Sequence, residues 1–321
     1  LITTKKGRAD KTTVTYSNNT TFSDPMMMPK FQNTYGNMTG EMMSWGLETD
    51  KRYDPANFFN TGSNVSNALS LSTGNDKSQS YISVATTNAT GIMPNNDYDR
   101  YNFSFRNTTN FLNNKFILDT SANYIIQNDK NMVSQGQYFN PLTSLYLFPR
   151  GEDFSDVAVY ERYDDLSGVN TQYWPYGDLG GVSSQNPYWI MNRMNRENDR
   201  RRYKLAASLQ YNIIEGLNVQ GRVSIDNTES KYTEKFHAGT VGNFAGPKGR
   251  YKEENRLDRQ VYADVLANFN KTFNEFNVTA NLGASIKDLR MELTSLHGDL
   301  NNVTNHFTIE NLTRSGYYKV N

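Results

Sequence analysis

The chain has 321 residues, with 33 basic and 33 acidic side chains, and its mean hydropathy is −0.73. No apolar run approaches the ~18 residues that a membrane-spanning helix requires, which excludes a helical membrane protein. The even charge gives no reason to expect a nucleic-acid partner, and the lack of cysteine excludes disulfides and thiolate metal sites.

Strands are predicted where apolar and polar residues alternate, because successive side chains of a strand point to opposite faces. The first runs over 11–22. After a connection of about forty residues, shorter strands are predicted at 65–73 and 78–88, the second of which alternates weakly and is included because its neighbours need a partner. The fourth and fifth strands meet at a turn near residue 113.

The second half of the chain begins with about seventy residues that lack sustained periodicity, and loops of that length tend to be functional. Strands six and seven join near residue 215, and strand eight covers 260–268. The ninth strand has the clearest alternation, with asparagine, threonine, serine and lysine between its apolar residues. These apolar residues are Phe276, Val278, Ala280, Leu282, Ala284 and Ile286.

Short and long connections fall at opposite ends of these strands. If the first strand rises from the inner side, the short turns near 75, 113, 215 and 273 all lie on that side. The long connections 23–64, 129–198, 233–255 and 290–321 lie on the other. Bacterial outer-membrane barrels have short periplasmic turns and long extracellular loops. We therefore predict an all-β, antiparallel transmembrane β-barrel.

The alternative from pattern alone is an antiparallel β-sandwich, which would alternate in the same way. A sandwich does not need its long loops at one end, and its strands are usually shorter. Nine strands is an odd number, whereas single-chain bacterial barrels have an even number. The chain is thus expected to be a partial barrel, about nine strands of a 22-stranded barrel with a plugged lumen.

Two segments resemble a known family. LITTKKG at 1–7 resembles the last plug strand of SusC/RagA-family TonB-dependent outer-membrane transporters, which leads into the first barrel strand. Residues 58–111 are similar to that family's first hairpins, with an aromatic-x-x-Gly entry, a Ser-rich strand ending in Gly-Asn-Asp-Lys and a Gly-Ile-x-Pro-Asn loop before Arg-Tyr. The resemblance implies the end of the plug domain at 1–10 and the N-terminal part of the barrel at 11–321.

The resemblance also implies a function. The whole protein would import a large nutrient, an oligosaccharide or a peptide, across the bacterial outer membrane. TonB would supply the energy through a segment absent from this sequence, and a SusD-like surface lipoprotein would cover the barrel as a lid. No covalent chemistry follows, so neither an enzyme activity nor a cofactor is expected.

Two other functions remain open. One is a structural or adhesive outer-membrane barrel without energised transport, which would need neither a plug nor a TonB-contacting segment. The other is a secreted carbohydrate-binding β-sandwich, which would stay soluble without detergent. No metal site is predicted, because His237, His297 and His306 have unrelated spacings and the paired aspartates near 97 and 164 lack EF-hand spacing.

The candidate substrate-binding residues lie in the long connection 129–198. Aromatic faces stack on sugar rings or hold peptide side chains, and Tyr and Trp dominate binding hot spots. The alternative is that these side chains pack the loop on itself or against the lid partner. The candidates are Arg150, Tyr173, Trp174, Tyr176, Tyr188 and Trp189.

A basic cluster follows that connection, over 193–204. Arg201 is in phase with Tyr203, which is predicted to face lipid, so Arg201 would meet the phosphates of lipopolysaccharide. Arg200 and Arg202 would point inward. The alternative is a solvated strand end without a specific partner.

Overall fold

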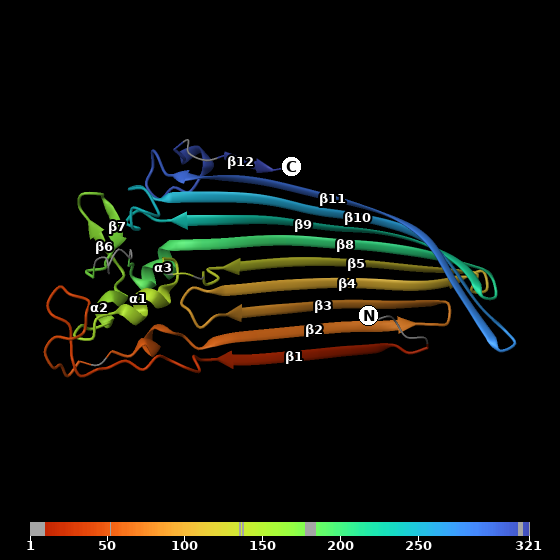
Figure 1. Cartoon of the computed structure of the whole chain (residues 1–321), viewed down its shortest axis with the longest axis horizontal. Helices are drawn as coiled ribbons and strands as arrows, with labels where there is room; N and C mark the ends of the chain where they lie inside the picture. The colour runs from red at the N-terminus through yellow and green to blue at the C-terminus, as the bar shows by residue number, and fades with distance from the viewer. Residues whose placement is uncertain are drawn as a thin grey trace.

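The computed structural model describes residues 10–51, 53–134, 136, 138–176, 184–313 and 317–320. Its main element is an antiparallel sheet of ten strands in the order β1-β2-β3-β4-β5-β8-β9-β10-β11-β12. Each strand pairs with the next along the chain, apart from β6 and β7, which form a separate pair (Figure 1). The described sheet does not close on itself. Residues 1–9, on which the predicted plug segment falls, lie outside the described residues.

The first nine strands of this sheet are long and the last is short. Their bounds are β1 (Thr13–Ser23), β2 (Gly62–Gly74), β3 (Ser78–Thr90), β4 (Asp97–Phe111), β5 (Phe116–Lys130), β8 (Met194–Ile214), β9 (Leu217–Phe236), β10 (Arg250–Phe273), β11 (Phe276–Asp299) and β12 (Tyr317–Val320). The predicted all-β, antiparallel architecture of about nine strands is therefore confirmed, including the weakly alternating third strand.

All four predicted connections are too long. In 23–64 and 129–198 the excess is a few residues, since β2 begins at Gly62 and β8 at Met194, and it is larger in the other two. The segments 233–255 and 290–321 were expected to be loops, yet β9 continues to Phe236, β10 begins at Arg250 and β11 continues to Asp299. The alternation disappears there because both faces carry charged side chains, while the ladder continues. Lys231 and Glu253, for example, form an ion pair of 3.1 Å on one face.

The short turns all lie at one end of the sheet, the turn end, as predicted (Figure 1). They cover 75–77, 112–115, 215–216 and 274–275. Several turn residues have positive φ, including Asn113 (54°), Asn114 (62°) and Asn274 (51°). Asparagine tolerates this left-handed conformation because its side chain forms hydrogen bonds with the local backbone. The longer connections lie at the opposite, loop end.

The register gives the sheet two unlike faces. Across neighbouring strands, apolar residues meet apolar residues at the same level, although many of these side chains are exposed: Leu205 is 47% and Ile286 71% exposed. We call this side the apolar face. One row of it contains Val14, Leu71, Ile82, Phe105, Ala122, Leu205, Ile225 and Val261. The intervening residues form the polar face.

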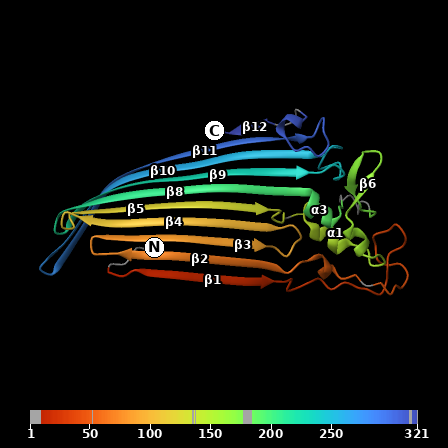
Figure 2. The ribbon, with the colours of Figure 1, turned by 180° about the vertical axis from the view of Figure 1, so that it is seen from behind.

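The buried core lies at the loop end of the sheet rather than along it. Four connections, including β9–β10 with Ala245, meet there and pack against the ends of β8 and β9 (Figure 2). The core contains Phe58 from the β1–β2 connection, Met93 from the β3–β4 connection and Leu145 and Trp189 from the β5–β8 connection. Of the helices that the structure describes, none has the length and apolar character to cross a membrane.

Candidate functional site

The described residues of the β5–β8 connection, 131–134, 136, 138–176 and 184–193, fold into a small unit at the loop end, which we call the cap (Figure 1). Its elements are α1 (Pro141–Leu147), α2 (Ser155–Ala158), β6 (Glu161–Asp164), β7 (Val169–Gln172) and α3 (Pro187–Arg193). Helices α1 and α3 both begin with Asn-Pro. The asparagine side chain accepts a hydrogen bond from the backbone of the second helical residue, and proline suits the first helical position.

Trp189 is the centre of the cap core. Its side chain is fully buried, at 0% exposed, and its indole Nε1 donates a hydrogen bond of 3.0 Å to Thr240 Oγ1 in the β9–β10 connection. Leu145 of α1 is equally buried, and Phe148 is 1% exposed. The tryptophan thus joins the cap to a second connection, because its ring and its polar atom both have partners.

Arg150 is a second buried member of the cap. Its guanidinium donates to the carbonyls of Phe148 (2.6 Å) and Tyr146 (3.1 Å). It also lies 4.1 Å from the ring of Phe31 and 4.8 Å from that of Tyr53. Burial lowers the pKa of Arg150, although the nearby Tyr53 opposes this shift. The side chain links the cap to the β1–β2 connection through cation–π contacts.

The six candidate substrate-binding residues come together, but not as exposed side chains. Arg150 (5% exposed) and Trp189 pack the loop on itself, which is the alternative that the sequence left open. Tyr173, Trp174, Tyr176 and Tyr188 are partly buried against the same core. Their contact with a substrate stays a prediction. Sequence could not separate these fates, since a binding aromatic and a packing aromatic are the same residue types.

Beside the cap, the polar face carries a groove across β8, β9 and β10 with a volume of about 640 Å³. We call it the polar-face groove. Residues that line it include Arg200, Arg202, Ser230, Tyr232, Arg256 and Asp258. The two-residue period of the sequence predicted that Arg200 and Arg202 point to the same side. The register confirms that both lie on the polar face, and that Arg201 lies with Tyr203 on the apolar face.

Most charged side chains that line the polar-face groove form ion pairs with residues in or beside it. Arg202 forms an ion pair of 2.5 Å with Asp226, and Arg256 one of 2.7 Å with Asp258. Lys252 lies 3.1 Å from Glu254. Such exposed pairs contribute little to stability, but they fix where charged groups point. The groove can therefore present oriented hydrogen-bond donors and acceptors to a polar ligand.

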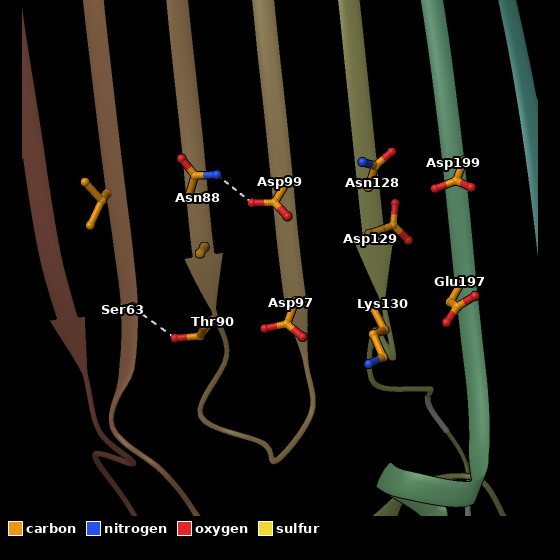
Figure 3. Close-up of a pocket in the computed structure, with 12 residues that line it drawn as sticks. Ser63, Asn88, Thr90, Asp97, Asp99, Asn128, Asp129, Lys130, Glu197 and Asp199 are labelled. Carbon is orange, nitrogen blue, oxygen red and sulfur yellow. Dashed lines mark hydrogen bonds between the residues drawn. The ribbon is translucent and has the colours of Figure 1, made fainter.

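A second groove lies at the loop end of the other face and is acidic (Figure 3). Its acids come from β4, β5 and β8, namely Asp97, Asp99, Asp129, Glu197 and Asp199. Asn88 donates a hydrogen bond of 2.6 Å to Asp99, and Lys235 lies 2.8 Å from Glu197. Across the described residues, no cluster of three or more His, Cys, Asp or Glu side chains has the arrangement of a metal site.

No protein-family model matches the chain, and no curated protein matches it. Among solved structures, the chain is similar to the RagAB peptide importer in its "closed-closed" state, with a TM-score of 0.69, 14% identity and coverage of 99% of this chain and 40% of that chain. For the "open-open" state, the TM-score is 0.68 and the identity 14%, with coverage of 98% of this chain and 38% of that chain. For a further structure of the RagAB peptide transporter, the TM-score is 0.69 and the identity 14%, with coverage of 98% of this chain and 40% of that chain.

The chain therefore spans about two fifths of the length of these similar chains. At this identity the likeness concerns the fold alone. It shows that the open antiparallel sheet is the fold of a partial β-barrel, in agreement with the predicted fold class.

Proposed function

We propose that the chain is part of the barrel wall of a bacterial outer-membrane transporter. The observation that carries this proposal is the two-faced sheet, whose apolar face leaves large hydrophobic side chains exposed. Exposed apolar surface of this extent is unfavourable in water and favourable in hydrocarbon. The polar face would then line the interior of the completed barrel.

The dimensions of the apolar face support a membrane position. On β8 the apolar-face residues from Tyr203 to Tyr211 span nine residues, and a tilted transmembrane strand needs about 9–11. Both ends of this band carry aromatic residues, as the girdles of outer-membrane barrels do. Beyond Tyr203, the same face carries Arg201 and Asp199, which suit the lipopolysaccharide head groups and the aqueous exterior.

We propose energised import of a large nutrient as the activity, with TonB acting through a segment outside the described residues. The similar chains belong to a peptide importer, which supports a peptide as cargo, and an oligosaccharide is the alternative. The cap and the neighbouring connections would face outward and receive a SusD-like surface lipoprotein as lid. In this account the protein is not an enzyme and needs no cofactor.

The test is uptake by intact cells. A strain that lacks the full-length protein should lose uptake of fluorescent oligopeptides, and a strain that lacks TonB should lose the same uptake. A panel of oligosaccharides measured in parallel identifies the cargo class. Uptake that persists without TonB would contradict energised import and favour a structural or adhesive barrel. Recovery of the protein in the soluble fraction without detergent would contradict the membrane assignment.

A further inference from the structure

The strand register aligns three arginines at one level of the polar face. Arg100 of β4 is opposite Gln127 of β5, which is opposite Arg200 of β8. Arg200 is opposite Ser230 of β9, and Ser230 is opposite Arg256 of β10. We call Arg100, Arg200 and Arg256 the arginine row. Since neighbouring strands lie about 4.8 Å apart, successive arginines are about 10 Å apart at their backbones.

No acidic residue lies in this five-strand row, and two of its three arginines have only neutral partners in the described part of the chain. Arg100 Nε donates to Asn102 Oδ1 (3.1 Å), and Arg200 Nε donates to Ser230 Oγ (3.4 Å). Arg256 alone has an acidic partner, Asp258. A guanidinium has five N–H donors, so Arg100 and Arg200 both retain donors for another group.

The acids around the row are already engaged. Asp226 pairs with Arg202, and Glu254 pairs with Lys252. Asp129 accepts hydrogen bonds from the amides of Gln127 (3.4 Å) and Asn198 (3.1 Å). The neutral amides leave the charge of Asp129 in place. Among the described residues, Arg100 and Arg200 lack an acidic partner and Asp129 alone of these acids lacks a basic one, so the excess charge at this level of the polar face is positive. Arg200 is also exposed and lines the polar-face groove, where a ligand can reach it.

We propose that the arginine row binds the carboxylates of acid-rich peptides on their way through the barrel. The planar guanidinium matches a carboxylate with two parallel hydrogen bonds. In a peptide with polyproline II conformation, residues three apart point to the same side and lie about 9 Å apart, which is close to the spacing of the row. The groove contains one aromatic residue, Tyr232, whose hydroxyl donates to Glu234, so it offers little surface for stacking sugar rings.

This inference rests on the proposed transport function and deepens it by naming the cargo. The test uses the purified full-length protein in detergent and two fluorescent octapeptides, one rich in Asp and Glu and the other with Asn and Gln at the same positions. The acidic peptide should bind about tenfold more tightly, because its hydrogen bonds to arginine are charge-assisted. The difference should decrease as salt is added.

Arg200→Gln should remove most of this preference and leave binding of the neutral peptide unchanged. Arg100→Gln, on a different strand, should act in the same direction, which guards against a folding defect of one variant. The matched control is Arg201→Gln, which removes the same charge one residue away on the opposite face and should have no effect. Equal effects of Arg200→Gln and Arg201→Gln would overturn the proposal.

Two further outcomes separate this inference from the transport proposal. If wild-type protein binds both octapeptides equally, or binds polygalacturonate but not the acidic peptide, the peptide-carboxylate assignment is overturned. TonB-dependent uptake of neutral peptides would then leave the transport proposal intact. If cells import no peptide or oligosaccharide of any charge through this protein, the transport proposal itself fails.

Discussion

The wall of the sheet and the cap use the same residue types in opposite ways. Tyr203 and Phe103 on the apolar face are 38% and 43% exposed, whereas Trp189 and Phe148 in the cap are 0% and 1% exposed. In the wall, the position of a side chain follows from its place in a period of two. In the cap, it follows from contacts with residues far away in the sequence. Aromatic content by itself therefore does not indicate whether a segment presents or buries its rings.

Truncation of the cap's central side chain tests this difference most strongly. Trp189→Ala removes a fully buried ring and its hydrogen bond to Thr240, and should lower the local stability of the cap by about 3–5 kcal/mol. Hydrogen exchange should show lost protection in 141–193 and unchanged protection in β2 to β5. Trp45→Ala is the control, because Trp45 is 76% exposed. Similar losses in both variants would mean that the cap has no packed core.

A charge on the apolar face tests the wall. Val223→Arg places a guanidinium near the middle of the apolar band, and Leu209→Arg places one nearer the turn end. Either should lower the free energy of unfolding in lipid by about 2–4 kcal/mol if the site lies near mid-membrane. Gln220→Arg, on the polar face, should have a much smaller effect. Unfolding by denaturant from lipid vesicles measures all three, and equal effects on the two faces would contradict the assignment.

The turns of the wall should be sensitive to backbone conformation. Gly216 has φ of +83°, and a Cβ there would lie 2.4 Å from the carbonyl oxygen of Asn270. Gly216→Ala should therefore destabilise the β8–β9 turn by about 1–3 kcal/mol. The control is Gly242→Ala in the β9–β10 connection, where nothing lies within 4 Å. Urea titration of both variants should leave the control at the wild-type midpoint.

The smallest expected effect is a pH dependence at the loop end. Burial lowers the pKa of His237, and the nearby positive charges of Arg193 and Lys235 act in the same direction, while its hydrogen bond to the Arg193 carbonyl and the charge of Glu161 oppose them. In the unfolded chain this histidine has its ordinary, higher pKa, so falling pH protonates the unfolded state before the folded one. The stability of the folded state should therefore fall as the pH drops below about 6.5 and towards the lowered pKa.

Protection factors for 237–240, measured by hydrogen exchange at pH 7.5 and pH 5.5, check this effect. They should be lower at pH 5.5 in the wild type. His237→Gln should remove the difference between the two pH values, whereas His306→Gln should leave it in place. A wild-type segment with the same protection at both pH values would show that this histidine is not held neutral by its surroundings.

The strands of the wall were predictable because the two faces of the sheet differ in polarity, and this difference appears in the sequence as alternation of apolar and polar residues. The alternation of 276–287 is visible without any knowledge of its neighbours. The ends of β9, β10 and β11 were misplaced because charges on both faces hide the alternation while the ladder continues. Sequence had no means to extend them, since cross-strand pairs such as Lys231 with Glu253 are more than twenty residues apart.

The packing of the cap and the alignment of the arginine row could not be predicted from local sequence either, because both depend on residues far apart in the chain. Arg150 is buried by Phe31 and Tyr53, about a hundred residues earlier in the chain. The alignment of Arg100 with Arg200 depends on the β5–β8 register across the whole cap. The alternation of side chains could assign Arg200 to the polar face, but it could not predict that Arg100 and Arg256 lie at the same level of the sheet.

The most direct test is a scan of single cysteines over 203–211 in β8, which is practical because this chain has no cysteine of its own. Spin labels on the full-length protein in lipid vesicles report collisions with oxygen, which concentrates in hydrocarbon, and with a water-soluble nickel complex. We expect oxygen access at 205, 207 and 209, and nickel access at 204, 206 and 208. Labels at 205, 207 and 209 that are shielded from both reagents, as beneath a second sheet, would contradict the account.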